Sequence, residues 1–189
     1  MKAILCKSYG TPENLVLEDI EDLKPREGEA LVEVYAASLN FPDTLQIAGK
    51  YQYQPPFPFI PGSEAGGIIK EIGPNVRGFD IGDRVMANPG IGAMAELLCV
   101  PFEHLRKIPD NMSFITASGF PMVYTTSYYA LKQRAKLKPG ETLLVLGASG
   151  GVGLAAVELG KLMGAVVIAG ASSSEKLDFA KKAGADFLV

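Results

Sequence analysis

The sequence contains few of the residues that form metal sites and disulfides. It has one histidine, two cysteines and no tryptophan among 189 residues. The two thiols, Cys6 and Cys99, lie far apart in the sequence, so no disulfide framework is expected, and each is predicted to be a small buried thiol in a strand. A reducing cytoplasm is the compartment that this cysteine usage favours. The histidine, His104, has no partner thiol and is predicted to be a surface or structural residue.

The sequence also lacks an excess of positive charge and a long uninterrupted apolar run. Lys and Arg number 18 against 21 Asp and Glu, so there is no basic face for non-specific nucleic-acid binding. The apolar run that begins at Thr142 is interrupted by glycines, Glu158 and Lys161, and does not predict a membrane span. Lys7 and Ser8 shorten the apolar part of the N-terminus too much for a secretory signal. We expect a cytoplasmic protein that binds neither nucleic acid nor membranes.

Up to about Pro121 the sequence is typical of a β-rich domain. Short runs with alternating or β-branched character are separated by Gly, Pro, Asn and Asp: LVLED, EALVEVYAAS, EAGGIIKEIG and AELLCV. The segment Tyr51 to Pro61 contains four prolines, which exclude a regular helix or a central strand, so it is predicted to be a loop held by its aromatic residues. We assign residues 1–122 to this first domain.

The pattern changes after Pro121. It predicts, in order, a helix over 124–137, a short apolar strand of the buried parallel type over 142–146, a helix from 151 capped at Gly164, a strand over 166–169, a helix from the capping box at 172–175 to 182, and a further apolar run over 185–189. Strand, helix, strand, helix, strand is the first half of a doubly wound parallel sheet. Residues 123–189 therefore form a second domain of the α/β class.

The turn between the first predicted strand and its helix has the spacing of a dinucleotide-binding fingerprint. It reads Ala148-Ser149-Gly150-Gly151-Val152-Gly153, with Gly147 just before it. Pyrophosphate is bound well where backbone N–H groups converge at a helix N-terminus, and glycines let the phosphates approach. The alternative is that the glycines only allow close packing of helix and strand.

The end of the second predicted strand indicates which cofactor is preferred. NAD sites place an Asp or Glu there for the ribose 2′-hydroxyl. Here Ala169, Gly170 and Ala171 occupy that place, followed by Ser172, Ser173 and Lys176, which offer two hydroxyls and an ammonium to a 2′-phosphate. NADPH is therefore favoured over NADH. The alternative is that the serines only cap the helix and that Lys176 is a solvated surface charge.

Several segments together resemble the zinc-independent, zeta-crystallin-like quinone oxidoreductase branch of the medium-chain dehydrogenase/reductase superfamily. They are SLNFPDTLQIAGKY, IPGSEAGGIIKEIGPNVRGFDIGDRV, TTSYYAL, LKPGETLLVLGASGGVG and SEKLDFAKKAGAD, in the family's order and spacing. The resemblance covers essentially the whole chain. It implies a GroES-like substrate domain followed by a Rossmann NADP-binding domain, of which only the first half is present.

The same superfamily contains zinc alcohol dehydrogenases, and the residues here differ from theirs. Ser63 stands where the zinc branch has a histidine before its glutamate, the early cysteine ligand is missing from residues 36–39, and Cys99 is the only thiol where the cysteine-rich lobe would fall. No metal is therefore expected. The chemistry would be hydride transfer from NADPH to a quinone or another α,β-unsaturated carbonyl, which accepts hydride because the added charge delocalises onto oxygen.

The resemblance also implies roles for individual residues. Asn40 would lie near the nicotinamide and the substrate, Asp43 would order that loop, and Tyr51 would line the cleft. Thr126 would contact the nicotinamide end of the cofactor. Leu45 departs from members that carry a tyrosine there, which weakens any transfer of substrate preference. The alternative for Asn40 and Asp43 is a turn held by Asx hydrogen bonds.

The final apolar run, GADFLV, does not resemble a terminus, so the chain is expected to be an N-terminal fragment that binds the adenosine side weakly and turns over poorly or not at all. A full-length form is expected to be a homodimer. Two other functions remain open: an enoyl- or acryloyl-thioester reductase of the same superfamily, and a non-enzymatic nucleotide-binding or structural protein.

Overall fold

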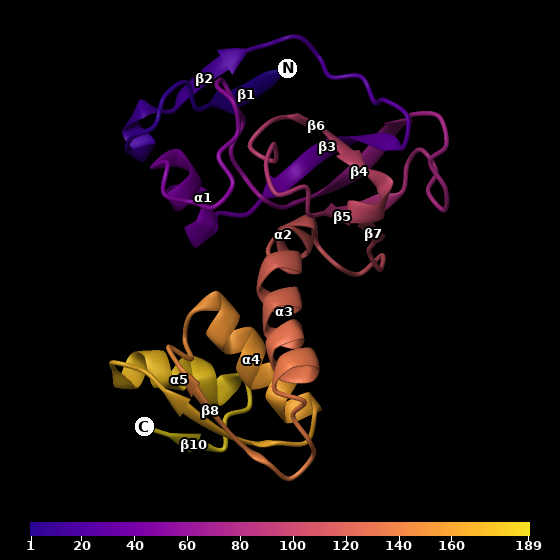
Figure 1. Ribbon diagram of the computed structural model, residues 1–189. Coiled ribbons are helices and arrows are strands. Elements are labelled where there is room, and N and C mark those ends of the chain that lie inside the picture. The colour runs from indigo at the N-terminus through magenta and orange to yellow at the C-terminus, as the bar shows by residue number, and fades with distance from the viewer. The chain divides into compact units, whose positions relative to one another are not determined.

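The computed structural model describes the chain from Met1 to Val189 (Figure 1). It divides into two compact units, Met1–Pro121 and Met122–Val189. Each unit has a hydrophobic core of its own, built from small and β-branched side chains.

The first unit is centred on a five-stranded antiparallel sheet with strand order β6-β3-β4-β5-β7 (Figure 1). The strands are β3 (Glu29–Ala37), β4 (Ala65–Ile72), β5 (Arg84–Ala87), β6 (Leu97–Pro101) and β7 (Leu105–Lys107). Their inward side chains, among them Val32, Ile69 and Val100, are almost completely buried. The sequence predicted β3, β4 and β6 from their alternating pattern, but it did not predict the shorter β5 and β7.

Two further strands and two short helices complete the first unit. They are β1 (Lys2–Leu5), which pairs with β2 (Val16–Asp19), α1 (Phe41–Ile47) and α2 (Phe114–Ser118), with single 3-10 turns at Pro12–Asn14 and Phe102–His104. The proline-rich segment is a loop, as predicted. It is held by the rings of Phe57, which contacts Tyr9 edge to face, and Phe59. Cys6 is buried beside Phe59, whereas Cys99 is only half-buried in β6, and both thiols are free.

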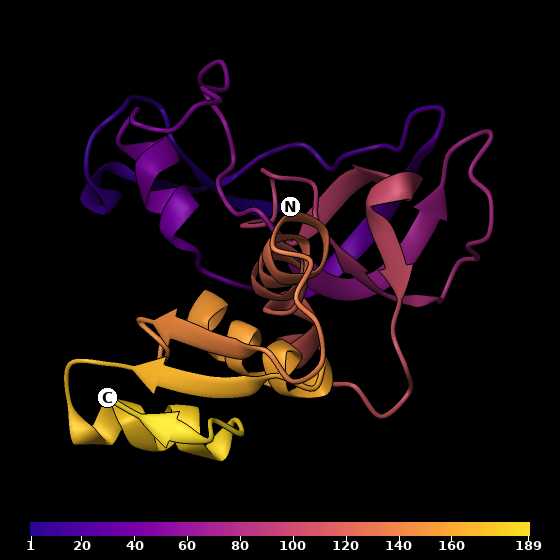
Figure 2. The same ribbon diagram turned by 60° about the horizontal axis from the view of Figure 1, so that its bottom comes forward.

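The second unit is a three-stranded parallel sheet with strand order β10-β9-β8 (Figure 2). Its elements are α3 (Pro121–Tyr128) with a π-helical turn over Tyr129–Arg134, β8 (Thr142–Leu146), α4 (Gly151–Leu162), β9 (Val166–Gly170), α5 (Ser174–Lys182) and β10 (Phe187–Leu188). The predicted alternation of strands and helices is confirmed. The first helix begins three residues earlier than predicted, and its π-helical turn ends at Arg134.

Helices α4 and α5 cover one face of this sheet and leave the other face apolar and open. The register row Val145–Ala169–Leu188 packs on the helices, and the neighbouring row Leu144–Ile168–Phe187 faces the opposite way. Leu144 is 54% exposed and Phe187 is 60% exposed. The sequence predicted a strand buried on both faces, and within this chain that expectation is wrong for β8, because no element of the second unit covers the second face.

No helix is both long enough and apolar enough to cross a bilayer.

Candidate functional site

The predicted substrate-side residues lie at the start of α1, in the first unit. Asn40 is the N-cap residue of this helix, with an extended backbone. Its backbone N–H donates to Oδ2 of Asp43 at 2.8 Å, and the backbone N–H of Asp43 donates to the carbonyl of Asn40 at 3.0 Å. The carboxylate three residues into the helix thus closes the turn on itself. The Asx-type turn considered as an alternative is therefore part of the structure.

The side-chain amide of Asn40 enters a polar network that the sequence analysis did not assign. Its Nδ2 donates to Oγ of Ser38 at 2.9 Å and to Oε1 of Glu64 at 2.8 Å, and lies 3.4 Å from Oγ of Ser63. The Ser38 hydroxyl donates to the same Oε1 at 2.6 Å. Glu64 is completely buried at the start of β4. Loop and strand are thereby joined by side chains 26 residues apart in sequence.

Asp43 is buried, with 2% of its surface exposed. Burial raises the pKa of its carboxyl group because the charged form loses hydration, and nearby Glu64 raises it further; hydrogen bonding by Asn40 and the Ser63 hydroxyl acts in the opposite direction. Oδ1 of Asp43 has no hydrogen-bond partner within the chain.

The third predicted residue, Tyr51, lies in the loop after α1 and is half-buried. It makes no hydrogen bond to Asn40 or Asp43, so the structure does not join it to the network. The side chains on either side of Asn40 are more informative, since Leu39 is 84% exposed and Phe41 is 74% exposed. A polar amide whose neighbours in sequence are two exposed apolar side chains is an arrangement that suits a flat, largely apolar ligand.

The glycine turn of the second unit joins β8 to α4. Gly150 is the N-cap of α4, and its carbonyl accepts the first helical hydrogen bond, from Leu154 N at 2.7 Å. The backbone N–H groups of residues 151–153 therefore have no acceptor within the helix. They converge at the N-terminus of a 12-residue helix, where the helix dipole favours an anion.

The glycines of this turn are required for different reasons. Gly147 has a φ of +63°, which side chains other than glycine rarely adopt. A Cβ on Gly153 would lie 2.3 Å from the Gly147 carbonyl oxygen, so the helix could not pack as closely on the turn. A Cβ on Gly150 would meet no atom closer than 3.5 Å, in an ordinary extended backbone. Packing therefore accounts for some of these glycines but not for Gly150, and pyrophosphate binding at the turn stays a prediction.

Helix α3 is held against the start of α4 by residues that the sequence analysis did not assign. The buried Ser127 hydroxyl donates to the carbonyl of Val152 at 2.8 Å. The Tyr124 hydroxyl donates a short hydrogen bond to Glu158, which raises the pKa of Tyr124 to about 12. Thr126, the predicted nicotinamide contact, is exposed beside Ser127. Ser127 follows Thr126 directly and lies within the TTSYYAL segment, so that segment could have pointed to Ser127 as well.

The residues predicted to bind a 2′-phosphate lie at the N-terminus of α5. The Lys176 ammonium donates to Oγ of Ser172 at 3.0 Å, and the backbone N–H of Lys176 donates to Oγ of Ser173, the N-cap, at 3.4 Å. All three are exposed. Ser173 caps the helix, as the alternative assumed, while Ser172 and Lys176 place a hydroxyl and a cation together just beyond β9. The capping role is confirmed for Ser173, and binding of a 2′-phosphate by Ser172 and Lys176 stays a prediction.

The predicted residues therefore form two separate groups, one in each unit. Asn40 and Asp43 belong to one network of the first unit, and the glycine turn, Thr126 and the Ser172–Lys176 pair belong to the second. His, Cys, Asp and Glu residues do not form any group of three that could hold a metal ion. His104 is exposed in its 3-10 turn.

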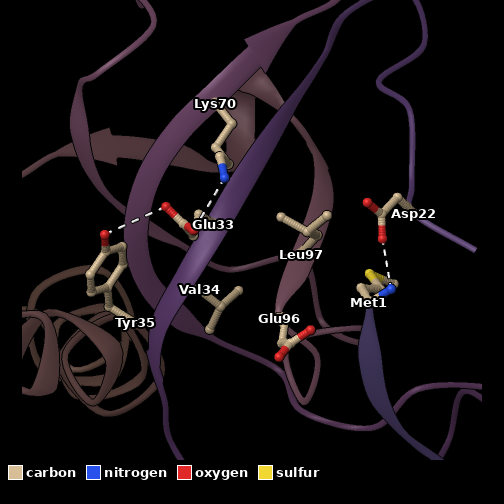
Figure 3. Close-up of a pocket in the computed structure, with 8 residues that line it drawn as sticks. All are labelled: Met1, Asp22, Glu33, Val34, Tyr35, Lys70, Glu96 and Leu97. Atoms are coloured by element: carbon tan, nitrogen blue, oxygen red, sulfur yellow. Dashed lines mark hydrogen bonds and ion pairs between the residues drawn. The ribbon is translucent and has the colours of Figure 1, made fainter. Parts of the chain in front are cut away.

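A pocket of about 630 Å³ in the first unit contains none of the predicted site residues (Figure 3). Its charged groups are already paired: Lys70 with Glu33 at 3.2 Å, and the Met1 amino group with Asp22 at 2.6 Å. The hydrogen bond that this amino group donates to the Asp22 carboxylate raises its pKa. The pairs in Figure 3 leave the pocket without an unpaired charge of either sign that would attract a ligand, apart from the exposed Glu96.

Known proteins are similar to this chain both in sequence and in structure. The family model of the alcohol dehydrogenase GroES-like domain matches residues 26–110. The synaptic vesicle membrane protein VAT-1 homolog-like of Mus musculus is 39% identical over 176 residues, which cover 93% of this chain and 42% of that protein. A quinone oxidoreductase-like protein 2 homolog of Nematostella vectensis is 41% identical over 189 residues, covering 97% of this chain and 50% of that protein.

Among solved structures, Escherichia coli quinone oxidoreductase complexed with NADPH matches with a TM-score of 0.93 and 32% identity, covering 100% of this chain and 58% of that chain. The chain spans about half the length of the curated relatives it matches. The fold, the glycine turn and these relatives agree with the predicted resemblance. Over the residues it spans, the chain is similar to quinone oxidoreductase-like proteins of the medium-chain dehydrogenase/reductase superfamily, and residues 26–110 match the GroES-like domain of the alcohol dehydrogenases.

Proposed function

We propose that the protein is an NADPH-dependent oxidoreductase that delivers hydride to quinones or related α,β-unsaturated carbonyls without zinc. Residues 1–122 provide the substrate side and residues 123–189 bind the nucleotide. Bound NADPH supplies the hydride, and the chain's own residues bind, orient and exclude water. The complex of the Escherichia coli relative with NADPH supports this choice of cofactor.

The observation that carries the proposal is the open space at Gly150. Packing explains Gly153 and backbone conformation explains Gly147, but no protein atom fills the place of a side chain at Gly150. A vacant position beside the unpaired amides of a helix N-terminus fits the close approach of a pyrophosphate. A ligand, rather than the fold, is then the reason for glycine at this position.

The Ser172–Lys176 pair supports NADPH over NADH. Beyond β9 the chain offers a hydroxyl and an ammonium 3.0 Å apart where an NAD site would carry an acid. The cation would attract the 2′-phosphate, and the hydroxyl would donate to it.

Zinc-free chemistry is supported by the donors around Asn40. Ser38 and Ser63 provide neutral hydroxyls, which are not the thiolate, imidazole or carboxylate groups that zinc prefers, and Glu64 Oε1 already accepts two hydrogen bonds. A quinone or enone does not need a metal to accept hydride, because its own carbonyl oxygen takes up the charge.

The test is a nicotinamide-fluorescence titration of the wild-type chain and of Gly150→Asp with NADPH. Aspartate is a favourable N-cap residue, so the fold is retained, but its carboxylate repels the phosphates. We expect affinity for NADPH to fall by at least about tenfold, a cost of about 1.4 kcal/mol. Ser113→Asp, at the N-cap of α2, is the matched control and leaves affinity unchanged. Equal affinity of wild type and Gly150→Asp would refute nucleotide binding at this turn.

A further inference from the structure

The orientation of the Asn40 amide determines which hydrogen bonds it can offer a ligand. Its Nδ2 is engaged by Ser38 and Glu64, with Ser63 nearby. Asn40 and Asp43 form a capping box in which Oδ1 of Asn40 lies toward the backbone N–H of Asp43, and that N–H donates to the Asn40 carbonyl at 3.0 Å. Both hydrogens of Nδ2 are used within the chain, whereas an amide oxygen has two acceptor positions. The oxygen is therefore the part of the amide that can still accept a hydrogen bond from a ligand.

The reversed orientation is disfavoured by the same neighbours. Oε1 of Glu64 can only accept from Asn40, because the Ser38 hydroxyl already donates to that oxygen at 2.6 Å. Turning the amide would bring Oδ1 against Oε1, two acceptors at hydrogen-bond distance, in a place where Glu64 is fully buried. The unmade hydrogen bonds would disfavour this orientation. Glu64 and Ser38 thus fix the amide in one orientation.

We propose that Glu64 and Ser38 are positioning residues that hold Asn40 as a hydrogen-bond acceptor, so that the site prefers a ligand hydroxyl over a ligand carbonyl. The proposal rests on the proposed function, since that function supplies the ligand class. Addition of a hydride and a proton converts a quinone into a hydroquinone, and hydride addition to an enone followed by protonation on oxygen gives an enol, so the hydroxyl donor that Asn40 accepts belongs to the reduced form. Asn40 does not polarise the carbonyl of the oxidised substrate.

The surroundings of Asn40 fit such a ligand. Leu39 and Phe41 are 84% and 74% exposed on either side of the amide. An aromatic ring can lie against these apolar side chains while its hydroxyl donates to Oδ1. A ring that carries only acceptors gains the apolar contact but no hydrogen bond.

The experiment compares two probes of matched shape, hydroquinone and 1,4-dimethoxybenzene, titrated anaerobically into the 15N-labelled chain and followed by NMR. Only hydroquinone has hydroxyl donors. A hydrogen bond between neutral groups corresponds to about 2- to 10-fold in affinity, so hydroquinone should bind tighter by that factor and shift the Asn40 resonances. The same titrations with an enol-type ligand and its methyl ether, in place of hydroquinone and 1,4-dimethoxybenzene, test whether the hydroxyl donor belongs to a reduced quinone or to a reduced enone.

Two variants test the role of the network. Asn40→Ala should reduce the ratio of the two affinities to about one. Glu64→Gln should reduce it as well, because an amide at residue 64 can donate to Oδ1 and release the orientation of Asn40. Glu71→Gln, an exposed glutamate on the same strand, is the matched control and keeps the wild-type ratio.

If Glu64→Gln fails to fold, the proposal is still tested by the ratio of the affinities for hydroquinone and 1,4-dimethoxybenzene in the wild type and in Asn40→Ala. Equal affinities for the two probes, absence of measurable binding by both, or an unchanged ratio in Asn40→Ala overturns the proposal. These measurements concern the first unit alone, whereas the NADPH titration concerns the second. Failure of one is therefore distinguishable from failure of the other.

Discussion

The loop at Asn40 and the turn at Gly150 both begin a helix, but they treat its N-terminus in opposite ways. At α1, Asp43 supplies a carboxylate that accepts the Asn40 N–H at 2.8 Å, so the anion is part of the chain. At α4 no side chain caps the helix, and its first amides remain available. A helix start that contains its own carboxylate is a rigid support for Asn40, whereas one without a cap can take an anion from outside.

The largest expected effect is on stability, from a substitution at Gly153 in the glycine turn between β8 and α4. Gly153→Ala places a Cβ 2.3 Å from the Gly147 carbonyl oxygen, so α4 must shift away from the turn. We expect the free energy of unfolding of the second unit to fall by about 2–3 kcal/mol. Hydrogen exchange of the amides in α4 and β8 measures it.

Gly150→Ala is the control for this prediction, since its Cβ meets no close atom. Replacing glycine by alanine at an N-cap costs about 1 kcal/mol at most. A loss of stability as large in Gly150→Ala as in Gly153→Ala would show that the two glycines are not required for different reasons.

A second prediction concerns the closed helix start. Burial raises the pKa of Asp43, so the folded state keeps this proton at pH values where the unfolded chain has lost it. The contribution of Asp43 to stability is therefore complete below the ordinary aspartate pKa of 3.8 and declines as pH rises through the raised value. Relative to Asp43→Asn, the wild type should lose stability over that interval.

Urea unfolding of both proteins at a series of pH values from about 3 to 8 measures this difference. Asp110→Asn, at an exposed carboxylate of the same unit, is the control. A wild-type advantage that grows with pH would mean that hydrogen bonding to Asp43, rather than its burial, controls the titration.

The smallest effect is expected on NADPH affinity, from a substitution at Lys176 in the second unit. Lys176→Gln removes the cation beside Ser172 but keeps a residue that tolerates the helix. Because Lys176 is exposed, its attraction for a 2′-phosphate is screened, and we expect NADPH affinity to fall only about 3- to 5-fold, with NADH affinity unchanged. Parallel titrations with both cofactors measure the ratio.

Lys181→Gln, on the last turn of the same helix, controls for the loss of one positive charge. If Lys176→Gln weakens NADH as much as NADPH, the residue acts through general charge or through the helix and does not recognise the 2′-phosphate.

Elements with a strong local pattern were predictable. The strand over 142–146 and the helix from Gly151 to the cap at Gly164 agree with β8 and α4, because apolar spacing and glycine conformations act over a few residues. The strands β5 and β7, of four and three residues, were not predicted, although β2, also of four residues, lay within the predicted run LVLED. Their pairing is decided by partners distant in sequence.

In the candidate site, too, residues with a local pattern were predictable, and residues defined by contacts distant in sequence were not. Asn40 and Asp43 are three residues apart, and their family-like spacing identified both. Ser38 and Glu64 stood in the quoted segments, but a sequence does not show that a loop hydroxyl and a strand carboxyl accept hydrogen bonds from the same amide. Ser127 and Tyr124 escaped notice for a similar reason, since their partners lie on the next helix.

The sequence by itself determined the order of strands and helices, the glycine turn and the absence of an acid beyond β9, because each depends on backbone preferences and spacing within one segment. Only the tertiary structure decided which way the Asn40 amide faces, why Gly150 is left without a neighbour, and which face of the parallel sheet is covered. These properties arise when segments far apart in sequence come into contact, and burial then sets both the hydrogen bonds that must be made and the pKa of the carboxyl group among them.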